Sequence, residues 1–516
     1  MRIVTAEQMK ELDRRASEEF GVPSIILMEN AGLRTFDVAC RMLKDIGGNR
    51  LVIVCGRGNN GGDGFVVARH LHQIGVDTRA LLVGPLEEVR GDARVNLEIA
   101  EKSGIPIENV TDIARARMAL AHCDLVVDAL FGTGIKGEIT GLAGEIIDEI
   151  NACGRPVVAV DLPSGLDADT GQICARCVQA DQTVTFGLPK IGLAIYPGAD
   201  YAGQVSVAQI GIPELAFETA GINTFLTDDE DVGNRLPARP PDAHKGTFGH
   251  AAIIAGSVGM TGAAAMAGMA AVRIGAGLVT LGVPESLNDI LEVKVTEVMT
   301  VPMPETQARS FSRAARQAAL ELISRCDAVA IGPGIGRHPE TAAFVHELLP
   351  KIKVPMVIDA DGLNAVAEDV SVLAKLKAPA IISPHPAEMA RLVGTTVETV
   401  QSNRLKAARD AAERFGVVVV LKGAGTVTAA PDGETWINTT GSVALATGGT
   451  GDVLTGAIVG LLGQGLSPLD AAISAVYIHG RAGEIAEEEI GSRGAAASDL
   501  LPLLPRVIRE VWENAK

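Results

Sequence analysis

Basic residues, aromatic residues and long apolar stretches are all scarce in this sequence of 516 residues. Lysine and arginine total 45 against 63 aspartates and glutamates, which gives a net charge of −18. Such an acidic chain does not favour nucleic acid or an anionic membrane surface as a partner. Its most apolar stretches are too short to span a bilayer, or are interrupted by Arg273. We therefore expect neither a nucleic-acid-binding protein nor a membrane protein.

Cysteines are also few. The seven cysteines are scattered and odd in number, which is typical of a reducing compartment. Cys174 and Cys177 form a single CxxC pair, and without a second pair we assign them no metal. The first 20 residues predict a charged amphipathic helix that begins with a capping box from Thr5 to Gln8, which does not resemble a secretory signal. These features predict a cytoplasmic protein.

The sequence does contain enough apolar material for a large core. Apolar residues make up 47% of the chain, which excludes global disorder, and the length suits two domains. Aromatics are only 3% while glycines number 58, which suits closely packed helices and many turns. Short apolar strands alternate with helical segments and predict parallel sheets covered on both faces. The predicted strands are Leu51–Cys55, Thr78–Val83, Leu125–Ala129, Pro156–Val160, Gln182–Phe186, Ala251–Ala255, Ala328–Ile331, Pro355–Ile358, Ala380–Ile382 and Val417–Leu421.

One irregular stretch interrupts this alternation. Residues Thr227–Lys245 contain the acidic run Asp228–Asp231, followed by Pro237, Pro240 and Pro241. An acidic run followed by prolines suits an inter-domain linker. The sequence therefore predicts two different α/β domains, over residues 1–220 and 228–512.

The most informative motif is Thr447-Gly448-Gly449-Thr450-Gly451-Asp452, which leads into an apolar helical run. Small residues at a helix start present backbone N–H groups and the positive end of the helix dipole to an anion. Asp452 beside them could take a proton from a hydroxyl while the amides hold a phosphoryl group. No GxxxxGK[ST] motif is present, so this would be a different kind of phosphate site. A Gly-rich turn that caps a buried helix is the alternative.

A second segment favours a nucleotide. The buried strand Val417–Leu421 ends in Lys422-Gly423-Ala424-Gly425-Thr426, about 30 residues before the first motif. A lysine, two glycines and a threonine directly after a strand suit contacts to a nucleotide. An ordinary hairpin connection with a surface lysine is the alternative. Together the two segments predict a nucleotide-using enzyme.

Polar residues also gather at predicted strand ends in the first half. Residues 56–64 satisfy GxGxxG between a strand and the predicted helix Phe65–Ile74, but the ribose-binding acid of a dinucleotide site is not evident. Asp128 and Asp161 close two further strands, and Ser164 follows the second. Carboxyl ends of parallel strands share one edge, so these side chains and Asn60 are expected to converge. Each residue alone is more often a turn or capping group.

These motifs resemble two known families. The first half is similar to NAD(P)H-hydrate epimerases through CGRGNNGGDGFVVARHL, VVDALFGTGIKG, DLPSGLDADTG and TFGLPKIGL. The second half resembles ADP- or ATP-dependent NAD(P)H-hydrate dehydratases through HKGTFGHAAIIAGS, GMTGAAAMAGMAAVRIGAGLVTL, GPGIGR, DADGLN, PHPAEMARLVG, LKGAGTV and ATGGTGDVLTG. The fused order looks like that of bifunctional NAD(P)H-hydrate repair enzymes. The resemblance implies a Rossmann-like three-layer α/β/α domain followed by a ribokinase-like α/β domain.

The resemblance also implies roles for matching positions. Substrate contacts in the first half would come from Asn59, Asn60, Gly61, Gly62, Asp63, Gly132, Thr133, Gly134, Ile135, Lys136, Gly137, Glu138 and Asp161. Asn60, Asp128 and Ser164 would surround a potassium ion. Substrate contacts in the second half would come from Gly336, His385 and Asp452, and nucleotide contacts from Lys422, Gly423, Ala424, Gly425, Thr426 and Gly451.

The implied substrate is NADH or NADPH that carries water across the C5–C6 bond of the nicotinamide ring. Asp161 is our candidate for proton transfer during epimerisation, and Asp452 is the candidate base that activates the C6 hydroxyl for phosphorylation by ADP or ATP, with magnesium. No residue settles which of the two nucleotides is preferred. A homo-oligomer is expected. The alternative is a kinase for a small alcohol, such as a vitamin or sugar, fused to a nucleotide-binding regulatory module.

Overall fold

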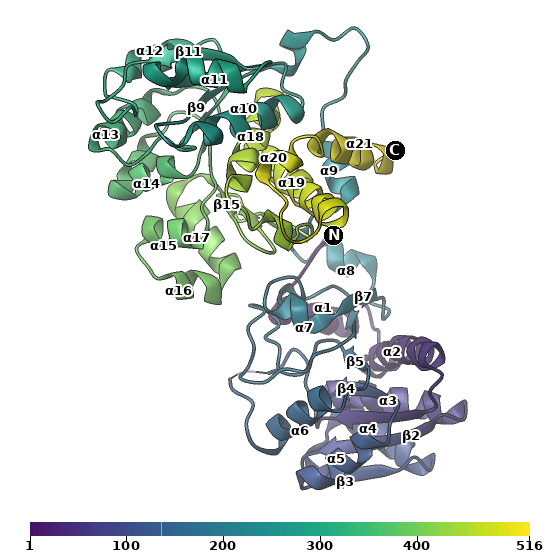
Figure 1. Cartoon of the computed structure of the whole chain (residues 1–516). Coiled ribbons are helices and arrows are strands. Elements are labelled where there is room, and N and C mark those ends of the chain that lie inside the picture. The colour runs from purple at the N-terminus through teal and green to yellow at the C-terminus, as the bar shows by residue number, and fades with distance from the viewer. Residues whose placement is uncertain (136) are drawn as a thin grey trace. The chain divides into compact units, whose positions relative to one another are not determined.

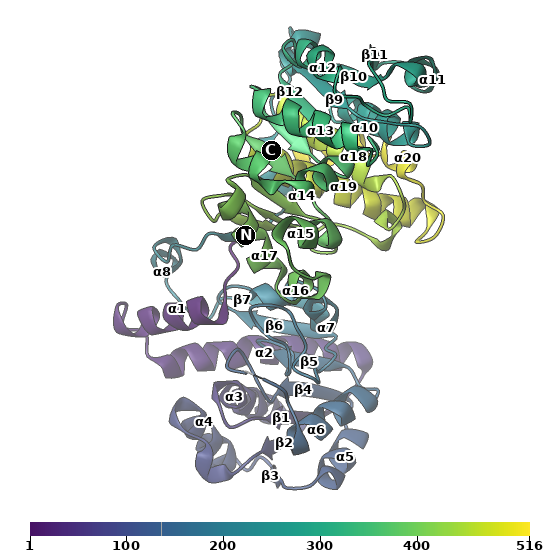
Figure 2. The same cartoon turned by 90° about the vertical axis from the view of Figure 1, so that its left-hand side faces the viewer.

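The chain divides into two compact units between Ile222 and Asn223. The computed structural model describes residues 1–135 and 137–516, so Lys136 of the predicted substrate loop lies outside the described residues. The first unit contains Arg2–Ile222, and the second contains Asn223–Lys516 together with Met1. Each unit is built around a sheet with helices packed against it (Figures 1 and 2). Within the described residues, no helix is both long and apolar enough to cross a bilayer.

The first unit has a wholly parallel sheet. Its described strands lie in the order β3-β2-β1-β4-β5-β6-β7. Successive strands are added on one side of β1 up to β3 and on the other side from β4 on, so the point where the order switches lies between β1 and β4. All five strands predicted in this half are confirmed within one residue. The strands are β1 (Arg50–Cys55), β2 (Asp77–Val83), β3 (Ile107–Val110), β4 (Leu125–Ala129), β5 (Val157–Val160), β6 (Gln182–Phe186) and β7 (Gln204–Ala208).

Helices cover both faces of this sheet, as a three-layer α/β/α domain requires. Along β1, Ile53 packs into a core that α1, α2, α3 and α4 share, while Val52 and Val54 pack into a second core with α5 and α6. The helices are α1 (Ala6–Glu18), α2 (Ser24–Ile46), α3 (Asn59–Gln73), α4 (Gly91–Lys102), α5 (Ile113–Ala121), α6 (Gly141–Ala152), α7 (Gly198–Ala202) and α8 (Glu214–Glu218). The predicted capping box is confirmed at α1, where Thr5 accepts a hydrogen bond from Gln8 N.

The second unit has a larger, mixed sheet. Its described strands follow the order β11-β10-β9-β12-β13-β14-β15-β16-β17-β8, with β16 antiparallel to both neighbours and the other pairs parallel. The five predicted strands are confirmed. The strands are β8 (Thr224–Leu226), β9 (His250–Ile254), β10 (Leu278–Pro284), β11 (Met299–Met303), β12 (Ala328–Ile331), β13 (Met356–Ile358), β14 (Ala380–Ile382), β15 (Val418–Leu421), β16 (Val427–Ala429) and β17 (Thr435–Ile437).

One face of this sheet packs against α10, α18, α19 and α21 in a single apolar core. In this core α10 and α18 lie side by side, as both views show (Figures 1 and 2). The helices of the unit are α9 (Asp229–Arg235), α10 (Thr261–Arg273), α11 (Asn288–Lys294), α12 (Ala315–Ile323), α13 (Pro339–Leu348), α14 (Asp361–Glu368), α15 (Pro386–Val393), α16 (Val397–Ser402), α17 (Arg404–Phe415), α18 (Thr450–Gly463), α19 (Pro468–Ile490), α20 (Ala497–Leu500) and α21 (Leu504–Asn514).

The interpretation of Thr227–Lys245 as an inter-domain linker is wrong. Strand β8 already belongs to the second sheet, and the acidic run forms the cap and first turn of α9. Asp228 accepts a hydrogen bond from Asp231 N at 2.9 Å, and acidic side chains at this end of a helix are favoured by its dipole. Helix α9 packs against α21, almost 280 residues further along the chain (Figure 1).

Glycines allow the close approach of α18 to α10. A Cβ on Gly456 would lie 2.1 Å from the carbonyl oxygen of Ala267, and one on Gly460 would lie 2.3 Å from Ile274 Cγ2. Such distances are far below van der Waals contact, so a larger residue would force the helices apart. Because the tip of α18 carries Asp452, this packing also positions the candidate catalytic carboxylate.

We predict that Gly456→Ala lowers the free energy of unfolding of the second unit by about 1–3 kcal/mol, the usual cost of overpacking a core. Gly463→Ala in the same helix is the matched control, because its Cβ would lie 3.6 Å from its nearest neighbour. The control should be neutral or more stable by up to about 1 kcal/mol. Thermal denaturation followed by circular dichroism measures both, and equal melting temperatures would contradict the packing described.

Candidate active sites

The candidate residues of the second unit lie at the carboxyl edge of its parallel strands. Ser257 follows β9, Gly336 follows β12, Asp359 follows β13, His385 follows β14 and Lys422 follows β15. The strand order reverses between β9 and β12, which is where open α/β sheets bind their ligands. The sheet therefore gathers side chains that are up to about 165 residues apart in sequence.

The tip of α18 is an anion cradle with a carboxylate beside it. Gly449 caps the helix with φ 99°, a backbone conformation that glycine favours. Within the described residues, the backbone amides of Gly448, Gly449 and Gly451 have no hydrogen-bond partner. Burial, with the nearby Asp359, raises the pKa of Asp452 to about 6 although Lys422 opposes the shift. The half-buried Asp452 carboxylate itself makes no ion pair or hydrogen bond to the described part of the chain.

Lys422 is largely covered, with 19% of its side chain exposed, and is ion-paired beside this tip. Its Nζ donates to Asp359 Oδ1 at 2.7 Å and lies 3.9 Å from Glu388 Oε2. Burial lowers the pKa of the ammonium, but Asp359 and Glu388 outweigh it and raise that pKa above its usual value. The second oxygen of Asp359 accepts from Thr455 Oγ1 of α18 at 2.6 Å. Lysine, aspartate and helix are thus linked in one charged network.

The segment Lys422–Thr426 connects β15 to the antiparallel β16, so the hairpin alternative correctly describes its geometry, although Lys422 is not a surface lysine. A Cβ on Gly451 would lie 3.8 Å from Lys422 Nζ, which places the hairpin directly against the tip of α18. Thr426 Oγ1 donates to Gly423 O at 2.8 Å and stabilises the turn. The two segments singled out from the sequence therefore meet.

Gly336 and His385 lie in the loops after β12 and β14, two strands that flank β13 in the sheet. Gly336 N donates to Asp361 Oδ2 at 3.0 Å. His385 caps α15 through Nδ1, which accepts from Ala387 N at 3.1 Å, while its Nε2 lies 3.3 Å from Glu388 Oε1. Burial and the nearby Lys422 lower the pKa of His385, so its imidazole is neutral. The cap gives His385 a structural role besides any contact it makes with substrate.

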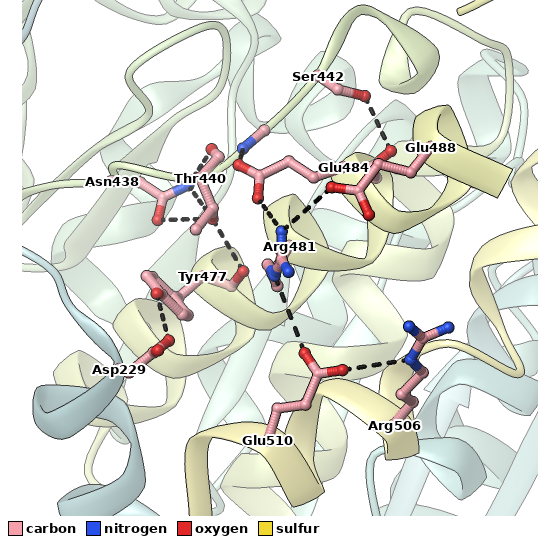
Figure 3. A network of polar contacts seen from close by, with 12 residues as sticks. Asp229, Asn438, Thr440, Ser442, Tyr477, Arg481, Glu484, Glu488, Arg506 and Glu510 are labelled. Carbon is pink, nitrogen blue, oxygen red and sulfur yellow. Dashed lines mark hydrogen bonds and ion pairs between the residues drawn. The ribbon is translucent and has the colours of Figure 1, made fainter. Parts of the chain in front are cut away.

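The loop that precedes the helix tip is anchored to α19 (Figure 3). Thr440 Oγ1 donates to Tyr477 O at 2.9 Å, Gly441 N to Glu484 Oε1 at 2.8 Å and Ser442 Oγ to Gly483 O at 2.9 Å. Arg481 in turn holds Glu484 at 2.8 Å. The approach to the glycine motif is therefore fixed by contacts to a long, buried helix.

In the first unit, Asn59–Asp63 form the first turn of α3, so the helix begins six residues earlier than predicted. Two glycines would ordinarily disfavour a helix start, but here they permit close packing. A Cβ on Gly61 would lie 1.9 Å from Gly56 O, and one on Gly56 would lie 1.9 Å from Leu130 O. Gly61 thus lets the first turn of α3 pack on the loop after β1, and Gly56 lets that loop pack on the loop after β4.

Asn60, Asp128 and Ser164 converge around the backbone of Phe131. Asn60 Nδ2 donates to Phe131 O at 2.9 Å, and Phe131 N donates to Ser164 Oγ at 2.8 Å. Ser164 donates from its backbone and its hydroxyl to the two oxygens of Asp128, at 2.7 and 2.6 Å. Burial raises the pKa of Asp128 to about 6, although these donors oppose the shift.

The remainder of the predicted substrate loop comes directly after Phe131 in the chain. A Cβ on Gly132 would lie 3.2 Å from Asn60 Oδ1, so the loop starts against the first turn of α3. Beyond it the residues Thr133, Gly134, Ile135, Gly137 and Glu138 are half-buried or exposed.

Asp161 is held by a buried lysine. Its backbone has φ 64°, a strained conformation for a residue other than glycine. Asp161 Oδ1 accepts from Lys190 Nζ, and from Thr185 Oγ1 and Phe186 N at 3.1 Å each. All three hydrogen bonds reach Oδ1, and Oδ2 accepts none from the described residues. Lys190 is completely buried.

Two further carboxyl groups surround this ion pair. Burial, together with the nearby Asp161, raises the pKa of Asp63 well above its usual value. Burial raises the pKa of Asp13 to about 6, with Lys190 opposing and Asp161 adding to the shift. Asp13 Oδ1 has no hydrogen-bond partner within the described residues. Three carboxyl groups thus share one ammonium group.

Sequence analysis missed Lys190, Asp13, Asp359 and Glu388 as site residues. Asp359 directly follows a buried strand, the same signal that identified Asp161, so it could have been found. Glu388 lies three residues after His385, which is the spacing of a capping box. Nothing local in the sequence marks Lys190 as a fully buried lysine or places Asp13 of α1 beside it.

Each of the two units matches a known protein family. Residues 24–192 match the family model described as "YjeF-related protein N-terminus", and residues 251–506 match the one described as "NAD(P)H-hydrate dehydratase". The bifunctional NAD(P)H-hydrate repair enzyme Nnr of Moorella thermoacetica is 48% identical over 100% of this chain and 98% of its own length. The enzyme of the same name from Escherichia coli is 35% identical over 98% of this chain and 93% of its own.

The second unit also resembles a solved structure. The ADP/ATP-dependent NAD(P)H-hydrate dehydratase of Bacillus subtilis, co-crystallised with ATP and Mg²⁺, is 33% identical, covers 56% of this chain and 100% of its own, and has a TM-score of 0.49. Similarity to repair enzymes over the full length does not favour the alternative of a small-alcohol kinase with a regulatory module. This chain, with its α/β/α unit followed by a ribokinase-like unit, belongs to the family of bifunctional NAD(P)H-hydrate repair enzymes.

Proposed function

We propose that the chain repairs hydrated NADH and NADPH in two steps, one in each unit. The first unit interconverts the R and S forms of the hydrate. The second unit dehydrates the S form to NADH or NADPH at the expense of ADP or ATP. The observation that carries this proposal is the tip of α18. Three glycine amides there have no hydrogen-bond partner among the described residues, and they lie beside Lys422 and the unpaired carboxylate of Asp452.

In the second unit, Asp452 is the base. Hydroxide is a poor leaving group, so the C6 hydroxyl must first be phosphorylated. Asp452 takes the hydroxyl proton as the oxygen attacks the γ-phosphorus of ATP or the β-phosphorus of ADP, and the nucleotide leaves shortened by one phosphate. The lone pair of the ring nitrogen then expels phosphate from C6, and loss of a proton from C5 restores the double bond.

The remaining groups of this site suit the phosphates. The amides of Gly448, Gly449 and Gly451 are placed to hold a transferring phosphoryl group, and Lys422 supplies positive charge next to them. The segment Lys422–Thr426 would hold the nucleotide, while Gly336 and His385 would contact the hydrate. Magnesium would be bound mainly through the phosphates, which supply most of its ligands in such sites.

In the first unit, Asp161 handles the proton. Three donors hold Oδ1 in place and leave Oδ2 as the acceptor for the C6 hydroxyl. Asp63, whose pKa is raised by burial, is the neighbouring candidate acid. Because the ring nitrogen can release the C6 oxygen, the configuration of C6 can invert without a redox cofactor. The loops Asn59–Asp63 and 132–138 would hold the nucleotide part of the substrate.

The residues around Phe131 suit a potassium ion. The side chains of Asn60, Asp128 and Ser164 and the carbonyl of Phe131 offer only oxygen ligands, as a hard cation prefers. No group of three or more His, Cys, Asp or Glu side chains that could hold a transition metal occurs in residues 1–135 and 137–516. Potassium would neutralise Asp128 and order the loop from which the substrate is bound.

We predict that Asp452→Asn slows dehydration of the S hydrate by about 10²–10⁴-fold, the usual loss for one general base. In the parent enzyme, kcat/KM should fall below about pH 6, because Asp452 must be ionised and its pKa is about 6. Release of NADH with ADP or ATP in excess, measured between pH 5 and 8, gives both results.

Asp327→Asn is the matched control, since Asp327 lies at the opposite, amino edge of the sheet, where it accepts from His250 N. It should dehydrate at the parental rate. A parental rate in Asp452→Asn, or an unchanged rate between pH 7 and 5, would refute Asp452 as the base.

For the first unit, we predict that Asp161→Asn slows epimerisation by about 10²–10⁴-fold while dehydration of the S form continues. The measurement is the recovery of NADH from a mixture of R and S hydrates with ADP or ATP. The parent enzyme should recover all of it rapidly, and Asp161→Asn only the S share in the same time. Asp124→Asn, at the amino edge beside Arg50, should behave as the parent does. Complete, rapid recovery by Asp161→Asn would remove Asp161 from the mechanism.

A further inference from the structure

Arg404 is a buried arginine that has no carboxylate partner among the described residues. It is 4% exposed and is the first residue of α17. Burial alone lowers the pKa of its guanidinium to about 10, so it remains charged at neutral pH. Its position at the amino end of a helix adds the unfavourable direction of the helix dipole. A buried, unpaired charge costs free energy, so the contacts that keep it there must offset that cost.

Two of those contacts reach the end of strand β15, and a third reaches Gln401 of α16. Arg404 Nη2 donates to Leu421 O at 3.1 Å and to Lys422 O at 3.3 Å. Nη1 donates to Gln401 Oε1 at 2.8 Å, and Nε has no hydrogen-bond partner in the described part of the chain. The guanidinium therefore holds the two carbonyl groups from which the segment Lys422–Thr426 departs.

Gly423 is shaped to receive this guanidinium. Its φ of 137° is a conformation that side chains rarely adopt, and a Cβ there would lie 3.0 Å from Arg404 Nη1 and 3.3 Å from Arg404 Cζ. The backbone of the loop thus rests directly on the arginine. Moving the guanidinium would release both the carbonyl of Lys422 and the turn at Gly423. The orientation of the Lys422 side chain would then no longer be fixed.

The charge of Arg404 also favours an anion at the loop. Lys422 is already engaged by Asp359 and Glu388, whereas the charge of Arg404 is not neutralised by a nearby carboxylate. In a chain with a net charge of −18, a nucleotide diphosphate or triphosphate needs local positive charge. Arg404 supplies it from behind the loop, where it contacts Lys422 O and Gly423.

We propose that Arg404 is a positioning residue for the nucleotide: it fixes the backbone at Lys422 and Gly423 and adds an uncompensated positive charge behind the loop that receives the phosphates. This inference rests on the proposed role of Lys422–Thr426 in nucleotide binding. Arg404 does not touch the hydrate, so its effect belongs to the nucleotide alone.

The test compares Arg404→Lys and Arg404→Met with Lys422→Met and with Arg409→Lys. Arg409 is the matched control, because it lies on the same helix but donates to Thr435 and Thr224 side chains, away from the loop. We expect both Arg404 variants to raise the KM for ADP or ATP about tenfold or more, the loss expected for a charged hydrogen bond. Their KM for the S hydrate and their kcat at saturating nucleotide should stay within about twofold of the parent.

The effect on the nucleotide should also appear without turnover. In calorimetry, both Arg404 variants should bind ADP more weakly than the parent enzyme does. Arg404→Lys retains the charge and volume, which keeps the test interpretable if Arg404→Met folds poorly. Suppose that Lys422→Met raises the nucleotide KM as expected. The inference is then overturned if the Arg404 variants lose thermal stability but keep the parental nucleotide KM, or if their KM values for nucleotide and hydrate change equally. An unchanged nucleotide KM in Lys422→Met would instead overturn the nucleotide role of the loop, and Arg404 with it.

Discussion

The ion pair between Lys422 and Asp359 is the interaction on which the second site depends. It joins the ends of β13 and β15, and the second oxygen of Asp359 continues the connection to Thr455 in α18. The helix tip, the hairpin loop and the sheet edge are therefore held in one charged network. Lys422 is paired with Asp359, and Asp452 has no partner of its own among the described residues. Burial, with the nearby charge of Asp359, raises the pKa of Asp452 to about 6, near the range in which a base works at neutral pH.

The first unit follows the same physical logic on a different sheet. A fully buried lysine, Lys190, holds Asp161 at the carboxyl edge, and the carboxyl groups of Asp63 and Asp13 beside it have raised pKa values. In both units one ammonium group stabilises one carboxylate and leaves others poorly neutralised. Such an arrangement places an acid and a base side by side, which suits chemistry at a hydroxyl group. It also makes both sites costly in stability, so each is supported by rigid strands.

The sequence predicted those strands and site residues that neighbouring residues in the chain make recognisable. The ten predicted strands were found because they are continuously apolar. The edge strands β3, β7, β8 and β11 carry polar or exposed residues and were missed, and so were the interior strands β10, β16 and β17. Asp128, Asp161 and the tip at Asp452 were found because polar or glycine-rich residues directly follow or precede apolar elements. Lys190 and Arg404 were missed because their burial depends on packing between distant segments. The acidic run at Asp228 was misjudged because the same residues suit a linker and a helix cap.

The central claim is that a phosphoryl group is transferred to the C6 hydroxyl before the C–O bond breaks. The most direct measurement uses S hydrate labelled with ¹⁸O in that hydroxyl, incubated with ADP or ATP and the enzyme, and follows the label by mass spectrometry of the phosphate released. The account predicts that each turnover places one labelled oxygen in inorganic phosphate. Label in water, with unlabelled phosphate, would contradict it.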